Sequence, residues 1–325
     1  MPTETHVHIF RLIRAKSSFL ITGHMRPDGD LCGTAIALRS ALVGLGRKAR
    51  IVLPEEPPER YRHMDGAEYL EAFDGSGLEG DAVFVLDSAG IDRIGAVAEA
   101  LPAGAPIVSI DHHLSNTGFG DVSWVEPEYS STGEMLYELA KAGGWPLPGV
   151  ACRALYAAIV TDTGRFSYSN TGAGALRAAA ELVELGVSPV SMARLLYRSK
   201  SERELRLQER ALASLKLAAG GRMSTMSLYS SDFRELGAKP TDAQDLAALT
   251  VSMAGVELGA FLYELEAGKV TKVSLRGAGG VDVSELAARF GGGGHAAASG
   301  CQLEMSLDQA RELLVEVGAE ALAGR

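Results

Sequence analysis

The chain has 325 residues, of which 46% are hydrophobic and 22% are charged, and its formal net charge at pH 7 is -10. This length and composition suit about two globular domains and exclude a disordered or fibrous protein. The negative charge argues against broad adhesion to nucleic acid or anionic lipid, so any contact with nucleic acid should be confined to one groove.

The three cysteines, Cys32, Cys152 and Cys301, are far apart and never in CxxC spacing. They indicate neither a disulfide framework nor a zinc ribbon. The N-terminal residues carry charges throughout, and no apolar run approaches the roughly 18 residues that a membrane span needs. We therefore expect a cytoplasmic protein without a membrane segment.

In the first part of the chain, short apolar segments alternate with intervals long enough for helices. The predicted strands are residues 19–22, 49–53, 81–86 and 106–110, and the predicted helices are residues 5–16, 31–45, 133–142, 152–160 and 174–185. This alternation is typical of α/β folds with a doubly wound parallel sheet. We expect His6 and His8 of the first helix to be exposed, and Asp30 to cap the second helix.

Gly186 breaks this pattern, and a polar segment that suits a linker helix runs to Gly220 and Gly221. Beyond it, strands at 223–229, 258–265 and 269–275 and helices near 242–253, 283–290 and 307–322 predict a smaller α/β domain. We predict a first domain of residues 1–186, a helical linker of residues 187–221 and a second domain of residues 222–325.

Residues that bind metals gather after the predicted strands. In a parallel sheet the carboxyl ends of the strands lie at one edge, where ligands bind. Imidazoles and carboxylates without thiolates suit Mn²⁺, Mg²⁺ or Fe²⁺ better than a structural zinc ion. The candidates are His24, Asp28 and Asp30 after the first strand, Asp87 after the third, Asp111, His112 and His113 after the fourth, and Asp162 after the helix 152–160.

These positions are more than one cation needs, so the pattern favours two divalent ions about 3.5–4 Å apart. Asp87 is the best candidate for a bridging ligand. Neighbours on an extended segment point in opposite directions, so His112 and His113 are not both expected to bind the same metal. The histidine that is not a ligand can contact phosphoryl oxygens or protonate the leaving oxygen, while Asp111 orients an imidazole.

Further residues are candidates for binding phosphate. Arg165 can pair with phosphate, or it can form a salt bridge at the surface. The glycines before His295 can form a phosphate cradle or a flexible linker, and the strand-like segment that follows favours a loop held in place. Arg276, at the end of a predicted strand, is another candidate.

Together these motifs resemble those of a known family, the DHH phosphoesterases. The four ordered motifs are His24-x-x-Pro-Asp28-Gly-Asp30, Val85-Leu-Asp87, Asp111-His112-His113 and Thr161-Asp162-Thr-Gly164, and Arg276 with Gly291-Gly-Gly-Gly-His295 resembles the DHH-associated C-terminal domain. The resemblance spans almost the whole chain and is greatest to the nano-RNase type. Cys32, Thr34 and Ser299 depart slightly from the pattern, and none of these departures removes a ligand.

The resemblance implies a hydrolase that degrades very short single-stranded RNA to mononucleotides and dephosphorylates 3′-phosphoadenosine 5′-phosphate. It also suggests a homodimer and two Mn²⁺ ions, or Mg²⁺ in their place. One ion would be bound by His24, Asp28 and Asp87, and the second by Asp30, Asp87, His112 and Asp162. His113 would act on the scissile phosphate, and Arg276, Gly293, Gly294 and His295 would hold the other end of the substrate.

Three other functions are alternatives to this one. A phosphodiesterase for cyclic di-AMP or pApA would present the same phosphodiester to the same metals, and the sequence separates it poorly from the nano-RNase type. A pyrophosphatase of this superfamily would have a different second domain, rich in lysine and arginine. A non-catalytic binding module is expected to have lost metal ligands, whereas every predicted ligand is present here.

Overall fold

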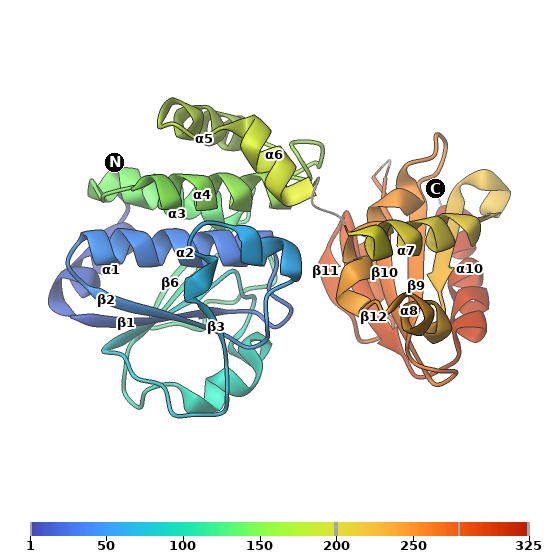
Figure 1. Cartoon of the computed structure of the whole chain (residues 1–325), viewed down its shortest axis with the longest axis horizontal. Coiled ribbons are helices and arrows are strands. Elements are labelled where there is room, and N and C mark those ends of the chain that lie inside the picture. Colours follow the sequence, from blue (N-terminus) through green and yellow to red (C-terminus); the bar gives the residue numbers. More distant parts are fainter. Residues whose placement is uncertain (1, 198–200, 279, 324–325) are drawn as a thin grey trace. The chain divides into compact units, whose positions relative to one another are not determined.

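The computed structural model describes residues 2–197, 201–278 and 280–323, and it divides into two compact units, Met1–Ser199 and Lys200–Arg325 (Figure 1). Each unit has its own sheet, with apolar clusters packed on it. The predicted linker and second domain include residues 198–200, 279, 324 and 325, which lie outside the described residues. The domain boundaries after residues 186 and 221 stay a prediction.

The first unit is built on a parallel sheet. Its strands are β1 (Ser18–Gly23), β2 (Lys48–Leu53), β3 (Leu70–Ala72), β4 (Ala82–Leu86), β5 (Ile107–Asp111) and β6 (Val122–Val125). They lie in the order β3-β2-β1-β4-β5-β6, and all neighbours are parallel. The predicted parallel sheet is confirmed, and β3 and β6 add a strand at each edge that was not predicted. Because the chain winds in opposite directions from β1 and from β4, these neighbours form a topological switch point.

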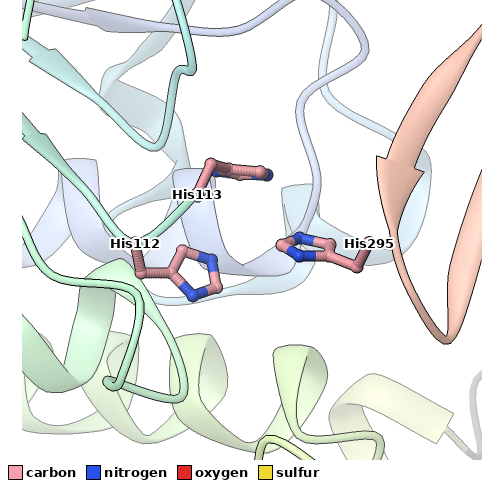
Figure 2. Close-up of side chains that lie close together, drawn as sticks. All are labelled: His112, His113 and His295. Atoms are coloured by element: carbon pink, nitrogen blue, oxygen red, sulfur yellow. The ribbon is translucent and has the colours of Figure 1, made fainter. Parts of the chain in front are cut away.

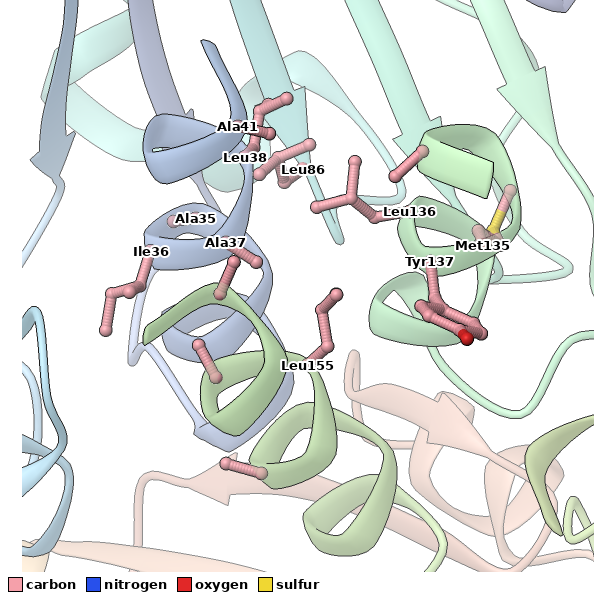
Figure 3. Close-up of a cluster of buried hydrophobic side chains, with 14 of the residues drawn as sticks. Ala35, Ile36, Ala37, Leu38, Ala41, Leu86, Met135, Leu136, Tyr137 and Leu155 are labelled. Atoms are coloured by element: carbon pink, nitrogen blue, oxygen red, sulfur yellow. The ribbon is translucent and has the colours of Figure 1, made fainter. Parts of the chain in front are cut away.

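Both faces of this sheet are covered, as a doubly wound fold requires. The helices are α1 (Glu4–Ala15), α2 (Gly29–Gly44), α3 (Thr132–Gly143), α4 (Gly149–Asp162), α5 (Ala173–Glu184) and α6 (Pro189–Tyr197), with the 3₁₀ helices η1 (Glu59–His63), η2 (Ala67–Tyr69) and η3 (Ile91–Ala100). Helices α2, α3 and α4 share one apolar core with the sheet, as Figure 3 shows for Leu38, Leu136 and Leu155. Ile94 and Val97 of η3 belong to a smaller core on the other face.

Strand β4 shows why a continuous apolar run forms the centre of the sheet. Phe84 and Leu86 belong to one core, whereas Val83 and Val85 belong to the other, and all four side chains are fully buried. Alternate side chains of a strand point to opposite faces, so a strand covered on both sides needs an apolar residue at every position.

Asp28 caps helix α2, and the prediction that Asp30 is the cap is wrong. Asp28 Oδ1 accepts hydrogen bonds from the N–H groups of Asp30 and Leu31, at 3.0 and 3.1 Å. The helix begins at Gly29, earlier than predicted. Asp30 therefore lies in the first turn, where its carboxylate is available to another element of the fold.

His6 is buried, contrary to the prediction that it is exposed. Its ring packs edge-on against Trp124 of β6, with 4.3 Å between the ring centroids, whereas His8 is exposed as predicted. The apolar spacing of α1 could not indicate this contact, because β6 was not among the predicted strands.

The second unit is a mixed α/β structure. Its strands are β7 (Lys216–Ala218), β8 (Met223–Leu228), β9 (Leu258–Glu266), β10 (Val270–Gly277), β11 (Gly293–His295) and β12 (Ala298–Leu303), in the order β11-β12-β10-β9-β8-β7. Its helices are α7 (Glu202–Ala213), α8 (Ser230–Leu236), α9 (Val283–Ala288) and α10 (Leu307–Ala323), with the 3₁₀ helices η4 (Ala219–Gly221) and η5 (Pro240–Val251). Strands β8 and β9 are parallel, and the other described neighbours are antiparallel. The helix predicted near 242–253 is the 3₁₀ helix η5.

All three cysteines are buried and free, so the prediction that they form no disulfide framework is confirmed. Among the described residues, no helix combines the length and the apolar content that crossing a bilayer would require.

Helices α2 and α4 approach each other closely through glycine. A Cβ atom on Gly33 would lie 2.3 Å from the carbonyl oxygen of Ala154 and 3.0 Å from Ala158 Cβ. One on Gly29 would lie 2.4 Å from the hydroxyl of Thr161. Larger residues would force the helices apart, so these glycines hold the start of α2 beside the end of α4.

We expect Gly33→Ala to lower the free energy of unfolding. Alanine favours a helix by about 1 kcal/mol over glycine, but overpacking a core costs about 1–3 kcal/mol. Urea unfolding of the chelator-treated protein measures the balance, and the exposed Ala180→Gly in α5 calibrates helix propensity alone. A midpoint that is unchanged or raised in Gly33→Ala would contradict the close contact.

Candidate metal centre

Six polar side chains meet at the carboxyl edge of the parallel sheet, beside the switch point. Three of them follow strands, and three lie at the ends of two helices that pack closely together. His24, Asp87 and His112 follow β1, β4 and β5, Asp28 and Asp30 are at the start of α2, and Asp162 is the last residue of α4. The structure thus brings together all six residues that were predicted as metal ligands.

The Asp87 carboxylate lies between two groups of these side chains. Its Oδ2 is 3.3 Å from His24 Nε2, whereas its Oδ1 is 3.5 Å from His112 Nε2. The carboxylate is almost fully buried, and the Thr132 hydroxyl donates a hydrogen bond to Oδ1 at 3.1 Å. Residue 87 has a left-handed backbone with φ of 54°, which Asp and Asn adopt more readily than most residues. Each carboxylate oxygen therefore faces a different group.

The first group consists of His24, Asp28 and Asp87, whose ligand atoms lie within 4.8 Å of one another. His24 Nδ1 is 2.8 Å from the carbonyl oxygen of Met25, so Nδ1 is the nitrogen that donates a hydrogen. Nε2 then faces Asp87 and Asp28 Oδ1, which is 3.8 Å away. One imidazole nitrogen and two carboxylates around one point suit a hard divalent cation.

The second group lies on the other side of Asp87. His112 Nε2 is 3.9 Å from Asp30 Oδ2 and 3.6 Å from Asp162 Oδ2. His112 Nδ1 is 3.3 Å from the carbonyl oxygen of Tyr129, which directs Nε2 toward the carboxylates. This group again offers one imidazole and several carboxylate oxygens.

Asp30 is held by the N-terminus of α3. Its carboxylate accepts hydrogen bonds from the N–H groups of Thr132 and Gly133, at 2.7 and 2.9 Å, and from the hydroxyl of Thr34 at 3.1 Å. The positive end of a helix dipole stabilises a nearby anion. The first turn of α3 therefore fixes the orientation of a carboxylate that is 1% exposed.

Four carboxylates share this small region, and their ion-pair partners among the described residues are imidazoles. In the described parts of the chain, Asp28, Asp30, Asp87 and Asp162 form ion pairs with histidines and with neither lysine nor arginine. Burial raises the pKa of Asp30 well above its usual value, and the charges of Asp87 and Asp162 raise it further. Divalent cations would relieve this repulsion, so the charges and the donor atoms both fit metal ions.

Burial and neighbouring charges also shift the pKa values of Asp162 and His24. Burial raises the pKa of Asp162 to about 7, and His112 opposes this rise while Asp87 adds to it. Burial alone would lower the pKa of His24, but the carboxylates of Asp28 and Asp87 raise it well above its usual value. Without cations, protons therefore remain on this centre up to about neutral pH.

His112 and His113 lie side by side and do not point in opposite directions as neighbours on a strand do, whereas the expectation that they do not both bind the same metal stays a prediction. Their ring centroids are 4.9 Å apart, with the ring planes inclined by 65° (Figure 2). Strand β5 ends at Asp111, so strand alternation no longer applies to the next two residues. The two rings nevertheless differ in their partners, because His113 Nδ1 is 2.7 Å from Asp111 Oδ1 whereas His112 faces Asp30 and Asp162.

Two asparagines that the sequence analysis missed hold carboxylates of this region. Asn116 Nδ2 donates to Asp111 Oδ2 at 2.9 Å, and Asn170 Nδ2 donates to Asp162 Oδ2 at 3.2 Å. Asparagine in a polar loop is an ordinary turn residue. The only available signal for Asn116 was its position, five residues after Asp111.

Arg165 follows the end of α4 and is exposed. Its guanidinium lies over the ring of Tyr197, with 4.8 Å from Cζ to the ring centroid. Arg165 and Phe166 both have left-handed backbones, with φ of 64° and 62°. Among the described residues Arg165 forms no salt bridge, and its binding of phosphate stays a prediction.

The predicted substrate-binding residues of the second unit lie on strands that share β12 as a neighbour. Arg276 is in β10, and Gly293, Gly294 and His295 form β11, where Figure 2 shows the side chain of His295. The glycine run therefore leads into a hairpin and is held in place. This agrees with the expectation of a fixed loop and not with that of a flexible linker. Gly294 has φ of 142°, and a Cβ atom there would lie 2.6 Å from the carbonyl oxygen of Ala298.

Comparisons with known proteins give matches that extend over both units of the chain. The family model described as "DHH family, N-terminal domain" matches residues 18–159, and that described as "DHHA1 domain" matches residues 225–321. The "bifunctional oligoribonuclease and PAP phosphatase NrnA" of Thermus thermophilus is 33% identical over 304 residues, covering 93% of this chain and 89% of that protein. The protein of the same name from Bacillus subtilis is 29% identical over 312 residues, covering 95% of this chain and 96% of that protein. An exopolyphosphatase-related protein from Bacteroides fragilis has a solved structure with a TM-score of 0.89 and 25% identity, covering 97% of this chain and 95% of that one.

We expect divalent cations to stabilise this protein more at pH 8 than at pH 6. The pKa values of Asp30, Asp162, His24 and His112 are raised in the fold, that of Asp162 to about 7. Protons bound to these groups therefore stabilise the cation-free fold fully below their unfolded pKa values, and this stability is lost as the pH rises through their folded pKa values. The affinity for a cation should rise about tenfold per pH unit for each proton displaced.

Thermal unfolding at both pH values, with a chelator and with a saturating divalent cation, measures this effect. The chelated protein should melt at a lower temperature at pH 8 than at pH 6. An increase in melting temperature with cation that is the same at both pH values would contradict the expected competition with protons.

Proposed function

This chain belongs to the DHH family of phosphoesterases, and we propose that it is a two-metal phosphodiesterase that degrades very short RNA oligonucleotides to mononucleotides. We further propose that it dephosphorylates 3′-phosphoadenosine 5′-phosphate. The observation that carries the proposal is the Asp87 carboxylate, whose two oxygens face separate groups of imidazoles and carboxylates. The names of the Thermus and Bacillus relatives support this choice of substrates.

We assign two cations to the groups on either side of Asp87. Mn²⁺ is the proposed ion, with Mg²⁺ as the alternative, because imidazole and carboxylate together suit Mn²⁺ whereas Mg²⁺ favours oxygen ligands. Two such ions activate water near neutral pH and neutralise charge on the phosphoryl group. The proposed ligands are His24, Asp28 and Asp87 for one ion and Asp30, Asp87, His112 and Asp162 for the other.

His113 is the proposed residue at the scissile phosphate. Burial alone would lower its pKa, but the Asp111 and Asp87 carboxylates raise it above the usual value, so the ring can carry a proton. A protonated ring can donate a hydrogen bond to a phosphoryl oxygen or a proton to the leaving oxygen. The Asp111 carboxylate holds the His113 ring by its contact with Nδ1 of that ring. Asp111 and His113 therefore act as a pair in the proposed reaction.

We propose that residues with hydrogen-bond donors bind the phosphates of the substrate. A chain with a net charge of -10 needs local donors to attract a phosphate. Arg276 and His295 supply side-chain donors, and Gly293 and Gly294 allow the backbone to approach a ligand closely. Arg165 is proposed as a further phosphate-binding residue near the metal ligands, because it follows Asp162 by three residues in the sequence.

A cytoplasmic location and a homodimer complete the proposal. A reducing compartment would keep the three free cysteines reduced. The homodimer is proposed from the family resemblance alone.

Parallel turnover assays test the choice of substrate. With Mn²⁺ present, we expect kcat/KM to be higher for di- to pentaribonucleotides than for cyclic di-AMP, with measurable release of phosphate from 3′-phosphoadenosine 5′-phosphate. A clear preference for cyclic di-AMP or pApA would replace this proposal with a cyclic dinucleotide or pApA phosphodiesterase on the same fold.

We expect Asp87→Asn to reduce kcat for a dinucleotide by about 1,000-fold or more, as the loss of a central catalytic group does. Asparagine tolerates the left-handed backbone at residue 87, so the fold should persist. Elemental analysis should find fewer than two bound ions per chain. Asp92→Asn, at an exposed aspartate of η3, serves as the matched control, and near-normal turnover in Asp87→Asn would refute the bridging role.

A further inference from the structure

Asn116 is a buried amide in the loop after β5, and both ends of its side chain have partners. Its Nδ2 donates to Asp111 Oδ2 at 2.9 Å and to the carbonyl oxygen of Ser88 at 3.0 Å. Its Oδ1 accepts the N–H of Gly118 at 2.8 Å. These contacts fix the orientation of the amide, with its NH₂ group directed at Asp111.

Asp111 is fully buried, and both of its oxygens are engaged as well. Oδ2 accepts the hydrogen bond from Asn116, and Oδ1 is 2.7 Å from His113 Nδ1. Asp87, Asp111 and His113 do bring ligand atoms within 4.8 Å of one another, as a metal site would. A metal bound there would have to displace the contacts that Asp111 already makes, so this third group is better suited to hold an imidazole than to bind a cation.

We propose that Asn116 is a positioning residue for His113 and acts through Asp111. Asn116 prevents rotation of the Asp111 carboxylate, and Asp111 accepts the Nδ1 hydrogen of His113. This contact fixes the tautomer and the orientation of the ring, so that Nε2 is the nitrogen presented to the scissile phosphate. The inference rests on the proposed phosphodiesterase activity, in which His113 meets that phosphate.

The hydrogen bond from Asn116 to Ser88 provides a competing explanation. Ser88 follows Asp87, so the same amide connects the end of β4 to the loop after β5. In that explanation Asn116 supports the Asp87 turn, and its loss would reduce metal binding. The number of bound metal ions therefore separates the two explanations.

Two variants test the proposal. Asn116→Asp keeps the size of the side chain and the oxygen that accepts from Gly118, but it replaces the donating NH₂ group with an oxygen that repels Asp111. Asn116→Ala removes the donor without adding charge. We expect each variant to lower kcat for a dinucleotide by about 10- to 100-fold, as the loss of an outer hydrogen-bond partner does, with KM and the number of bound metal ions unchanged at a temperature where the variant is folded.

Combination with His113→Ala distinguishes positioning from a general structural role. If Asn116 acts through His113, its replacement should cause no further loss of kcat in the His113→Ala background. Asn170→Asp is the matched control, because Asn170 contacts Asp162 and its effect should multiply with that of His113→Ala. Multiplied losses for Asn116, or a loss of bound metal, would overturn the proposal.

A measurement without turnover keeps this inference separate from the proposed function. The NMR signal of the His113 Nδ1 hydrogen should exchange slowly with water in the wild-type protein and rapidly in Asn116→Asp. Slow exchange in both proteins would refute the positioning role. If the wild-type chain hydrolyses no phosphodiester, the proposed function fails, whereas this signal still decides the role of Asn116.

Discussion

Repulsion between four clustered carboxylates, of which Asp30 and Asp87 are buried, is the constraint on which the first unit depends. Asp28 approaches His24, Asp30 and Asp162 approach His112, and Asp87 approaches both imidazoles. In the described structure the ion pairs of these four carboxylates are with histidines alone. Partial charges offset part of this repulsion, because the N–H groups that begin α2 and α3 donate to Asp28 and Asp30. A lysine or arginine here would neutralise the carboxylates permanently, whereas helix ends and imidazoles leave them able to bind cations.

The parallel sheet makes this concentration of charge achievable. Asp30 receives hydrogen bonds from residues 102 and 103 positions away in the sequence, so the centre forms only when distant segments have packed. The switch point brings the ends of β1 and β4 together, and Gly29 and Gly33 let α4 deliver Asp162 beside them. Apolar packing on both faces of the sheet therefore supplies the stability that allows the edge to be electrostatically unfavourable.

The sequence predicted the parallel sheet and the proximity of the six candidate ligands, because apolar runs that end in His or Asp are local patterns. What it could not predict depended on contacts between distant segments. His6 is buried by a strand that was not predicted, and the orientation of His113 depends on where β5 ends. Asn116 looks like an ordinary turn residue until its partner Asp111 is seen across the loop. The sequence could not identify the cap of α2, because Asp28 and Asp30 are both aspartates and suit an N-cap equally well.

The left-handed backbone at residue 87 has a consequence for how this position can vary. Glycine and asparagine fit the conformation but offer no carboxylate, and glutamate offers a carboxylate on a longer side chain that favours other backbone angles. Among the twenty amino acids, aspartate alone meets both demands. Natural variants and engineered libraries of this fold should therefore be nearly invariant at this position for two independent reasons, one steric and one chemical.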